Sequence, residues 1–268
     1  MFNLCNMRHL SIFLALILFS SCSSTFQDGE VYYKRGEFEK AISTFNKVLF
    51  LNVTDVKSLH LRARSYEEME EYGKALKDYK TIIKYKPTYA HAHAGIGMIS
   101  FKLKDYATAE KHLLLASLHD YKDYDILFYL GRAMIMNENY KSADEFLQLA
   151  RDIKPREPMT YYYQGIARAK YGDPLGTASA FNMYVGLNPD KVEGLYNRGF
   201  AYMIIGMTSW AIEDFDQVLK KNPKHYEAMA RRGACLMRTE PGKACQDLRL
   251  AANNGSQYGK EKLAQFCH

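Results

Sequence analysis

Residues 192–223 read VEGLYNRGFAYMIIGMTSWAIEDFDQVLKKNP, and this stretch decides the fold. Small residues, Gly199 and Ala211, stand in two apolar segments, and Gly206 lies between these segments. Pro223 stands where the second segment must stop, because proline cannot continue a helix and disfavours helical geometry in its predecessor. We therefore expect a helix, a tight turn and a second helix.

The same pattern recurs along the chain with a period of 34 residues. A column of small residues runs without a gap through Gly29, Ala63, Gly97, Gly131, Gly165, Gly199 and Gly233. A second column holds Ala41, Ala75, Ala109, Ala143 and Ala211, with Thr177 at the missing mark. A third column holds the large residues Phe45, Tyr79, Leu113, Leu147, Phe181 and Phe215. Prolines recur at Pro87, Pro155, Pro189 and Pro223. Several columns in one register indicate an internal repeat.

The columns have a physical explanation in helix packing. Two helices approach closely only where a side chain is absent or small, and the glycine and alanine columns supply such positions. The large residues fill the remaining space, because protein interiors are packed as densely as organic crystals. One helix pair cannot bury its apolar face alone, so successive pairs must stack.

The period and the pattern resemble the tetratricopeptide repeat over about residues 25–254. The matching residues are clearest at Leu195, Gly199, Tyr202, Gly206, Ala211, Phe215, Val218 and Pro223. The resemblance implies an all-α, right-handed α-solenoid of about seven helix pairs whose concave face is lined by the first helices. The expected units are residues 22–55, 56–89, 90–123, 124–157, 158–191, 192–225 and 226–255, followed by a capping helix over 256–268.

Three units depart from the pattern. The first lacks most of its first helix, and the fifth carries Gly172-Asp173-Pro174 at its turn. The seventh is one residue short, so that Cys245 rather than Ala244 falls on the 34-residue mark.

Composition and charge limit the classes of protein to which this chain can belong. Of the 268 residues, 47% are hydrophobic and 25% are charged, which supplies a substantial core and excludes wholesale disorder. The formal net charge of +6 is spread along the chain. Because a nucleic-acid binder shows a concentrated basic stripe, we expect no nucleic-acid partner.

The N-terminus predicts a targeting segment. Arg8 is the only charged residue before Asp28, and Leu10 to Phe19 form an apolar run of ten residues. That run is about half the roughly 20 residues that span a bilayer. A short basic region, a short apolar run and small residues after it are typical of a secretory signal. Cys22 follows at once, and the segment resembles a bacterial lipoprotein signal, in which the cysteine is lipidated and becomes the new N-terminus.

This resemblance implies that residues 1–21 are removed and that Cys22 carries lipid. The protein would be exported and anchored in the bacterial envelope, with Ser23 favouring the outer membrane and the periplasmic side. Phe19 departs from the leucine that is usual in the family. An ordinary cleaved signal or an uncleaved anchor, with Cys22 incidental, is the alternative.

The C-terminal cysteines suggest a disulfide bond. Ser256 is a plausible N-cap for a last helix, with Leu263, Ala264 and Phe266 forming its apolar edge and residues 260–262 facing water. Cys245 lies on the second helix of the seventh pair and Cys267 on the cap that packs against it. An exported protein can oxidise such thiols, so we predict a Cys245–Cys267 disulfide. Buried free thiols are the alternative.

The resemblance also implies a binding groove on the first helices. Its recurring positions are His60, Arg64, Met98, Phe101, Phe128, Arg132, Ile135, Met136, Tyr162, Ile166, Tyr196, Phe200, Met203 and Met237. Phe128, Tyr162 and Tyr196 share one repeat position and are expected to form a ladder, with Arg132 and Lys170 flanking it. Aromatic rings and methionines suit an adaptable apolar interface. The alternative is that some of these side chains pack against the second helix of their own pair.

The sequence indicates no catalytic, cofactor or metal site. Phosphate-binding, nucleophile-elbow and zinc-protease motifs are absent from the chain. His91 and His93 are two residues apart, and such positions face different sides of a helix, so we expect solvated histidines rather than metal ligands.

The predicted function is a non-enzymatic scaffold or adaptor that binds a peptide or helix of another envelope protein in the groove. A regulatory subunit that modulates an envelope enzyme, such as a peptidoglycan hydrolase or protease, is the alternative. A small-molecule or glycan receptor, or an enzyme that uses the groove, is a third possibility. Fold alone does not distinguish them.

Overall fold

The computed structural model describes residues 25–120 and 122–267, and the predicted signal segment and Cys22 lie outside these residues. The described chain forms fifteen α-helices and no strand. It divides into two compact units, Met1–Tyr121 and Lys122–His268, which we call the N-terminal and C-terminal units. This all-α architecture confirms the predicted fold class.

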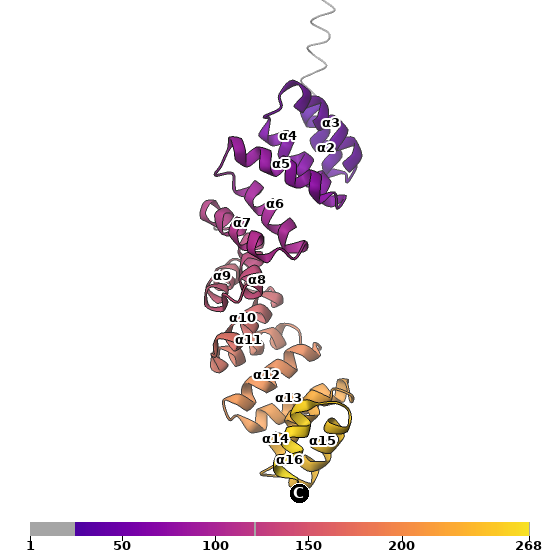
Figure 1. Ribbon diagram of the computed structural model, residues 1–268, viewed down its shortest axis with the longest axis vertical. Coiled ribbons are helices and arrows are strands. Elements are labelled where there is room, and N and C mark those ends of the chain that lie inside the picture. Colours follow the sequence, from indigo (N-terminus) through magenta and orange to yellow (C-terminus); the bar gives the residue numbers. More distant parts are fainter. Residues whose placement is uncertain (1–24, 121, 268) are drawn as a thin grey trace, which may run out of the picture. The chain divides into compact units, whose positions relative to one another are not determined.

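Antiparallel helix pairs make up both units (Figure 1). The N-terminal unit contains α2 (Thr25–Lys34) with α3 (Phe38–Leu51), α4 (Val56–Glu68) with α5 (Tyr72–Tyr85), and α6 (Ala90–Lys102) with α7 (Tyr106–His119). The C-terminal unit contains α8 (Tyr124–Met136) with α9 (Tyr140–Ile153), α10 (Pro158–Tyr171) with α11 (Pro174–Leu187), α12 (Val192–Ile204) with α13 (Thr208–Lys221), and α14 (Tyr226–Leu236) with α15 (Pro241–Asn253), followed by α16 (Gln257–Phe266). Within each unit, every pair packs on the next.

The small-residue column lies where the two helices of a pair touch. A Cβ atom added to Gly97 would stand 2.6 Å from Leu113 Cγ, and one added to Gly131 would stand 2.6 Å from Leu147 Cγ. Both distances are far inside van der Waals contact. Leu113 and Leu147 belong to the large-residue column of the second helix and are fully buried. The packing role inferred from the sequence is therefore confirmed at these positions.

Arginines on three first helices join neighbouring pairs. Arg198 of α12 donates to both carboxylate oxygens of Asp214 on α13, at 2.9 and 2.7 Å, and to Asn182 Oδ1 on α11 at 3.0 Å. Arg62 and Arg232 occupy the same repeat position and bind in the same way. A bidentate pair of this kind fixes geometry as well as contributing energy. The sequence analysis did not predict these arginine–aspartate pairs, although Arg62, Arg198 and Arg232 are separated by multiples of 34 residues.

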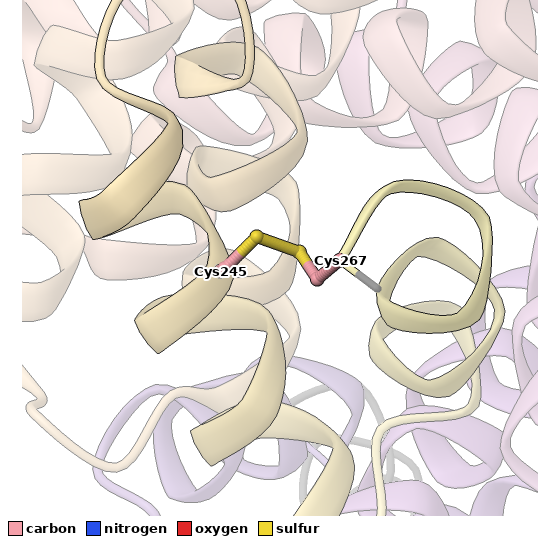
Figure 2. The surroundings of a disulfide bond; sticks show 2 residues. All are labelled: Cys245 and Cys267. Atoms are coloured by element: carbon pink, nitrogen blue, oxygen red, sulfur yellow. A yellow bond between two sulfur atoms is a disulfide. The ribbon is translucent and has the colours of Figure 1, made fainter.

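The seventh pair shows how a missing residue is accommodated. Its first helix, α14, has 11 residues, and Ala244 rather than Cys245 is fully buried in the interface. Cys245 then points toward α16, where it forms a disulfide with Cys267 across a Cα–Cα distance of 5.8 Å (Figure 2). Cys235 of α14 is a buried free thiol.

The capping helix begins as predicted, with Ser256 Oγ accepting a hydrogen bond from the Gly259 backbone N–H at 3.0 Å. The prediction for its faces is partly wrong. Leu263 packs against the core, but Ala264 is exposed and Lys262 is half-buried. The inward face of α16 instead carries Tyr258, Leu263 and the disulfide-bonded Cys267. None of the described helices combines the length and the apolarity that crossing a membrane requires.

Candidate binding groove

First helices of the C-terminal unit carry most of the predicted groove residues. Met98 and Phe101 lie on α6 in the N-terminal unit. His60 and Arg64 lie on α4 of the same unit, Ile135 lies on α8, and Met237 is the C-cap of α14. Nine predicted residues form one face of three helices: Phe128, Arg132 and Met136 on α8, Tyr162, Ile166 and Lys170 on α10, and Tyr196, Phe200 and Met203 on α12. Spacings of three and four residues place each trio on one side of its helix. We call these nine residues the groove face.

The groove face is closed at one end and open at the other. On α8, Phe128 is only 9% exposed, whereas Met136, two turns further on, is 51% exposed. On α10, Tyr162 and Ile166 are half-buried and Lys170 is exposed. A ligand would therefore reach the C-terminal ends of these helices more readily than their starts.

An arginine held among aromatic rings lies at the α8 end of the face. The Arg132 guanidinium carbon lies 5.4 Å from the ring centre of Phe128, 5.2 Å from that of Tyr129 and 4.7 Å from that of Tyr163. Phe128 also stacks on Tyr124, with ring centres 5.4 Å apart. These contacts hold Arg132 in place through its attraction to the ring faces.

Two rings of the predicted ladder pack within their own pairs. Tyr162 contacts Phe181 and Tyr184 of α11, with ring centres 5.8 and 5.2 Å apart. Tyr196 contacts Phe215 of α13 at 6.1 Å. These two tyrosines therefore pack against the second helix of their own pair, which is the alternative that the sequence left open. Their rings form the base of the groove face rather than its exposed edge.

Arg231 of α14 repeats the arginine–aromatic arrangement near the cap. Its guanidinium carbon lies 4.3 Å from the ring centre of Phe200 and 4.7 Å from that of Tyr258 on α16. Its Nε donates to Tyr196 Oη at 2.9 Å, and Glu227 is 4.0 Å away. The Arg231 guanidinium is therefore engaged by groups within the protein.

Met203 of the groove face also lines a cavity of about 380 Å³ within the C-terminal unit. Its described lining is mainly apolar and contains two cations and no acid: Met203, Thr208, Ala234, Cys235, Met237, Arg238, Tyr258, Lys262 and Phe266. Met203 and Met237 were predicted. The residues of α16 were missed, although Tyr258, Lys262 and Phe266 are spaced four apart and so lie on one helix face.

Burial and charge define what this cavity can bind. Burial raises the pKa of the Cys235 thiol to about 11, so it stays protonated and acts as a small apolar group near neutral pH. Lys262 Nζ lies 5.6 Å from the Phe266 ring centre, and Arg238 is exposed at the rim. The combination of apolar walls and cations suits an apolar side chain next to a carboxylate.

The histidines near α6 pair in a way the sequence only partly predicted. His91 stacks on His60, with ring centres 5.6 Å apart, while His93 Nδ1 lies 3.0 Å from His112 Nδ1. The two residues do face different sides, as expected. The expectation that they are solvated is wrong for His93, which is 6% exposed and bonded to the Pro87 carbonyl oxygen. Among the described residues, no three histidine, cysteine or acidic side chains gather as metal ligands would.

Comparison with known proteins supports the repeat assignment. A family model described as tetratricopeptide repeat matches residues 60–118, and one described as anaphase-promoting complex, cyclosome, subunit 3 matches residues 10–82. Hsp70-Hsp90 organizing protein of Triticum aestivum is 24% identical over 221 residues, covering 77% of this chain and 36% of that protein. The chain spans about two fifths of the length of the curated relatives it matches.

Solved structures share the fold. YrrB, described as a TPR protein with an unusual peptide-binding site, has a TM-score of 0.65 and 22% identity, covering 69% of this chain and 95% of its own. The C-terminal part of a TPR repeat-containing protein from Cytophaga hutchinsonii has a TM-score of 0.63 and 18% identity, covering 89% and 99%. Together with the 34-residue columns and the glycine contacts, these matches identify the chain as a tetratricopeptide-repeat protein.

Proposed function

We propose that this protein is a non-enzymatic scaffold or adaptor of the bacterial cell envelope. It holds a peptide or helix of a partner protein against the groove face of the C-terminal unit. Proteins with this repeat are generally interaction modules, and this supports a binding role at the level of the family. The envelope location is inferred from the N-terminal sequence and the C-terminal cysteines, and the binding surface from the groove face.

One observation carries the proposal. The groove face is most exposed at Met136 and Lys170, and its Met203 also lines the cavity beside α16. Methionine side chains adapt to ligands of different shape, and a ring such as Phe266, which is 41% exposed, supplies a flat apolar contact. Lys262 and Arg238 favour a partner segment that carries an acidic group beside its apolar side chains.

The envelope location rests on the N-terminal sequence and on the C-terminal cysteines. The basic residue, the apolar run and Cys22 resemble a lipoprotein signal. A disulfide between Cys245 and Cys267 fits an oxidising compartment. Metabolic labelling with a fatty-acid analogue tests the anchor: the wild-type chain should take up label and Cys22→Ser should not. Equal labelling of both would refute lipidation at Cys22.

Site-specific photocrosslinking tests the groove. A benzophenone side chain placed at Met136 or Phe266 should give discrete adducts with the same partner in native membranes. Matched control positions are Leu149 and Met183, which lie on second helices and are 48% and 46% exposed. They should give no such adduct. Adducts that appear equally at control positions, or only there, would contradict the assignment of the groove.

A further inference from the structure

An apolar tip stands at the end of α3 in the N-terminal unit. Phe50 is 86% exposed, Leu51 69% and Val53 66%, whereas the preceding Leu49 is 6% exposed and lies in the core. The packing of α3 is therefore satisfied without the three exposed side chains. Three large apolar residues exposed together mark a surface that meets something other than water.

The tip lies at the end of the pair from which the predicted anchor emerges. Ring centres of Phe26 and Phe45 are 6.0 Å apart, and those of Tyr33 and Phe38 are 5.9 Å apart. These contacts show that α2 and α3 run antiparallel, so the start of α2 and the C-terminal half of α3 lie at the same end of the pair. In the sequence Cys22 precedes the start of α2 by three residues. A lipid on Cys22 would thus be attached three residues before α2 in the sequence.

The apolar surface continues along the same edge of the N-terminal unit. Tyr85, at the end of α5, is 51% exposed, and Leu118, in the last turn of α7, is 68% exposed. Tyr85 occupies the repeat position of Leu51, and Leu118 occupies that of Phe50. The second helices α3, α5 and α7 therefore end on a shared edge. At these positions α13 carries the exposed pair Lys220 and Lys221, which shows that the repeat itself does not require an apolar edge. We call Phe50, Leu51, Val53, Tyr85 and Leu118 the apolar edge.

Exposed lysines flank the apolar edge. Lys84 and Lys86 lie on either side of Tyr85, and Lys57 opens α4 next to the tip. The Asp55 carboxylate is engaged in capping α4, where it accepts from the Ser58 backbone N–H at 2.9 Å. Apolar side chains beside lysines complement a surface of acyl chains and anionic headgroups.

We propose that the apolar edge inserts into the interface of an anionic lipid bilayer, as a second membrane contact beside the lipid anchor. A single acyl chain gives only marginal and reversible membrane attachment, and a second contact both strengthens it and fixes the orientation of the protein. The flanking lysines, and the position of the tip at the end of the pair where α2 begins, favour a bilayer over a protein partner or a second copy of the chain.

Vesicle binding tests this proposal in the full-length chain. All variants carry Cys22→Ser, so that acylation contributes to none of them, and residues 1–21 are common to all. The probes are vesicles of phosphatidylcholine alone or mixed equally with phosphatidylglycerol. Replacing Phe50, Leu51 and Val53 by serine should lower partitioning onto the mixed vesicles by about tenfold or more. The matched control, serine at Leu149, Met183 and Leu250, should partition like the parent. Equal partitioning of both triple variants would overturn the proposal.

A fluorescent reporter identifies the occupant of the tip. Phe50→Trp, in a chain with Trp210→Phe, should emit as an exposed indole until vesicles are added. It should then shift to shorter wavelength and be quenched by lipids with brominated acyl chains. If the emission is already that of a buried indole without vesicles, another protein segment or a second copy covers the tip and the membrane proposal is overturned.

Discussion

Arginines on the first helices differ in what they contact: some bind carboxylates in bidentate pairs, and others lie among several aromatic rings. Arg198 binds a buried carboxylate in a bidentate pair, so its donors are used within the fold. Arg132 and Arg231 instead lie among aromatic rings beside the groove face. The same residue type thus joins neighbouring pairs at the position of Arg198 and packs against aromatic rings at the positions of Arg132 and Arg231.

His60 gives the clearest pH dependence at the residue scale. Burial, followed by the charges of His91 and Arg64, lowers the pKa of His60 to about 4. The unfolded chain takes up this proton near pH 6.5, whereas the folded chain takes it up only near pH 4. The contribution of His60 to the free energy of unfolding is therefore complete above about pH 6.5 and is lost as the pH falls toward 4. We expect about 2 kcal/mol less stability at pH 4.5 than at pH 7 from this residue alone.

Urea unfolding of wild type and His60→Gln at the two pH values measures this contribution. The variant should lose less stability on acidification than the wild type, whatever its stability at pH 7. The same loss in both proteins would show that His60 is not the titrating group.

At the scale of the element, the helix pair depends on glycine where the two helices touch. Gly131→Ala should destabilise the protein by about 1–3 kcal/mol, because the added Cβ stands 2.6 Å from Leu147 Cγ. Gly186 is exposed on α11 and has no atom within 4 Å of an added Cβ, so Gly186→Ala should stabilise by up to about 1 kcal/mol. Chemical denaturation of both variants checks the signs. Equal effects would mean that close packing is not the reason for the glycine column.

The capping helix provides a second element-scale prediction. The Cys245–Cys267 bond closes a loop across a sequence separation of 22 residues, and replacing both cysteines by serine should cost up to about 3 kcal/mol. Amide hydrogen exchange should show α16 losing protection first, because a terminal element frays most readily. Unchanged protection of α16 in the double-serine variant would contradict the role given to the disulfide.

Sequence reasoning was sufficient for the helix pairs because their determinants are local and repeated. Gly131 and Leu147 meet because their two columns are sixteen residues apart in each of the first six units. It was insufficient for the binding surface, because the direction of a side chain depends on neighbouring helices. The sequence of α10 alone does not indicate that the Tyr162 ring packs against Tyr184. The spacing within α16 places Lys262 on one helix face, but it does not indicate that this face lines a cavity.

For the whole molecule, the two proposed surfaces belong to different compact units. The apolar edge belongs to the N-terminal unit, and the groove face with its cavity belongs to the C-terminal unit. Because each unit has its own core, a change to one surface should leave the other intact. Vesicle binding and partner binding are therefore expected to respond to different substitutions, and each proposal can fail without the other.

The most direct measurement is affinity purification from native membranes with two matched double variants. Met136→Glu with Phe266→Glu places charges on the open groove, and Leu149→Glu with Met183→Glu places them on second helices at similar exposure. We predict that the groove variant keeps wild-type helicity and loses a partner that the control variant and the wild type retain. Retention of the same partner by the groove variant would contradict the assignment of the groove as the binding surface.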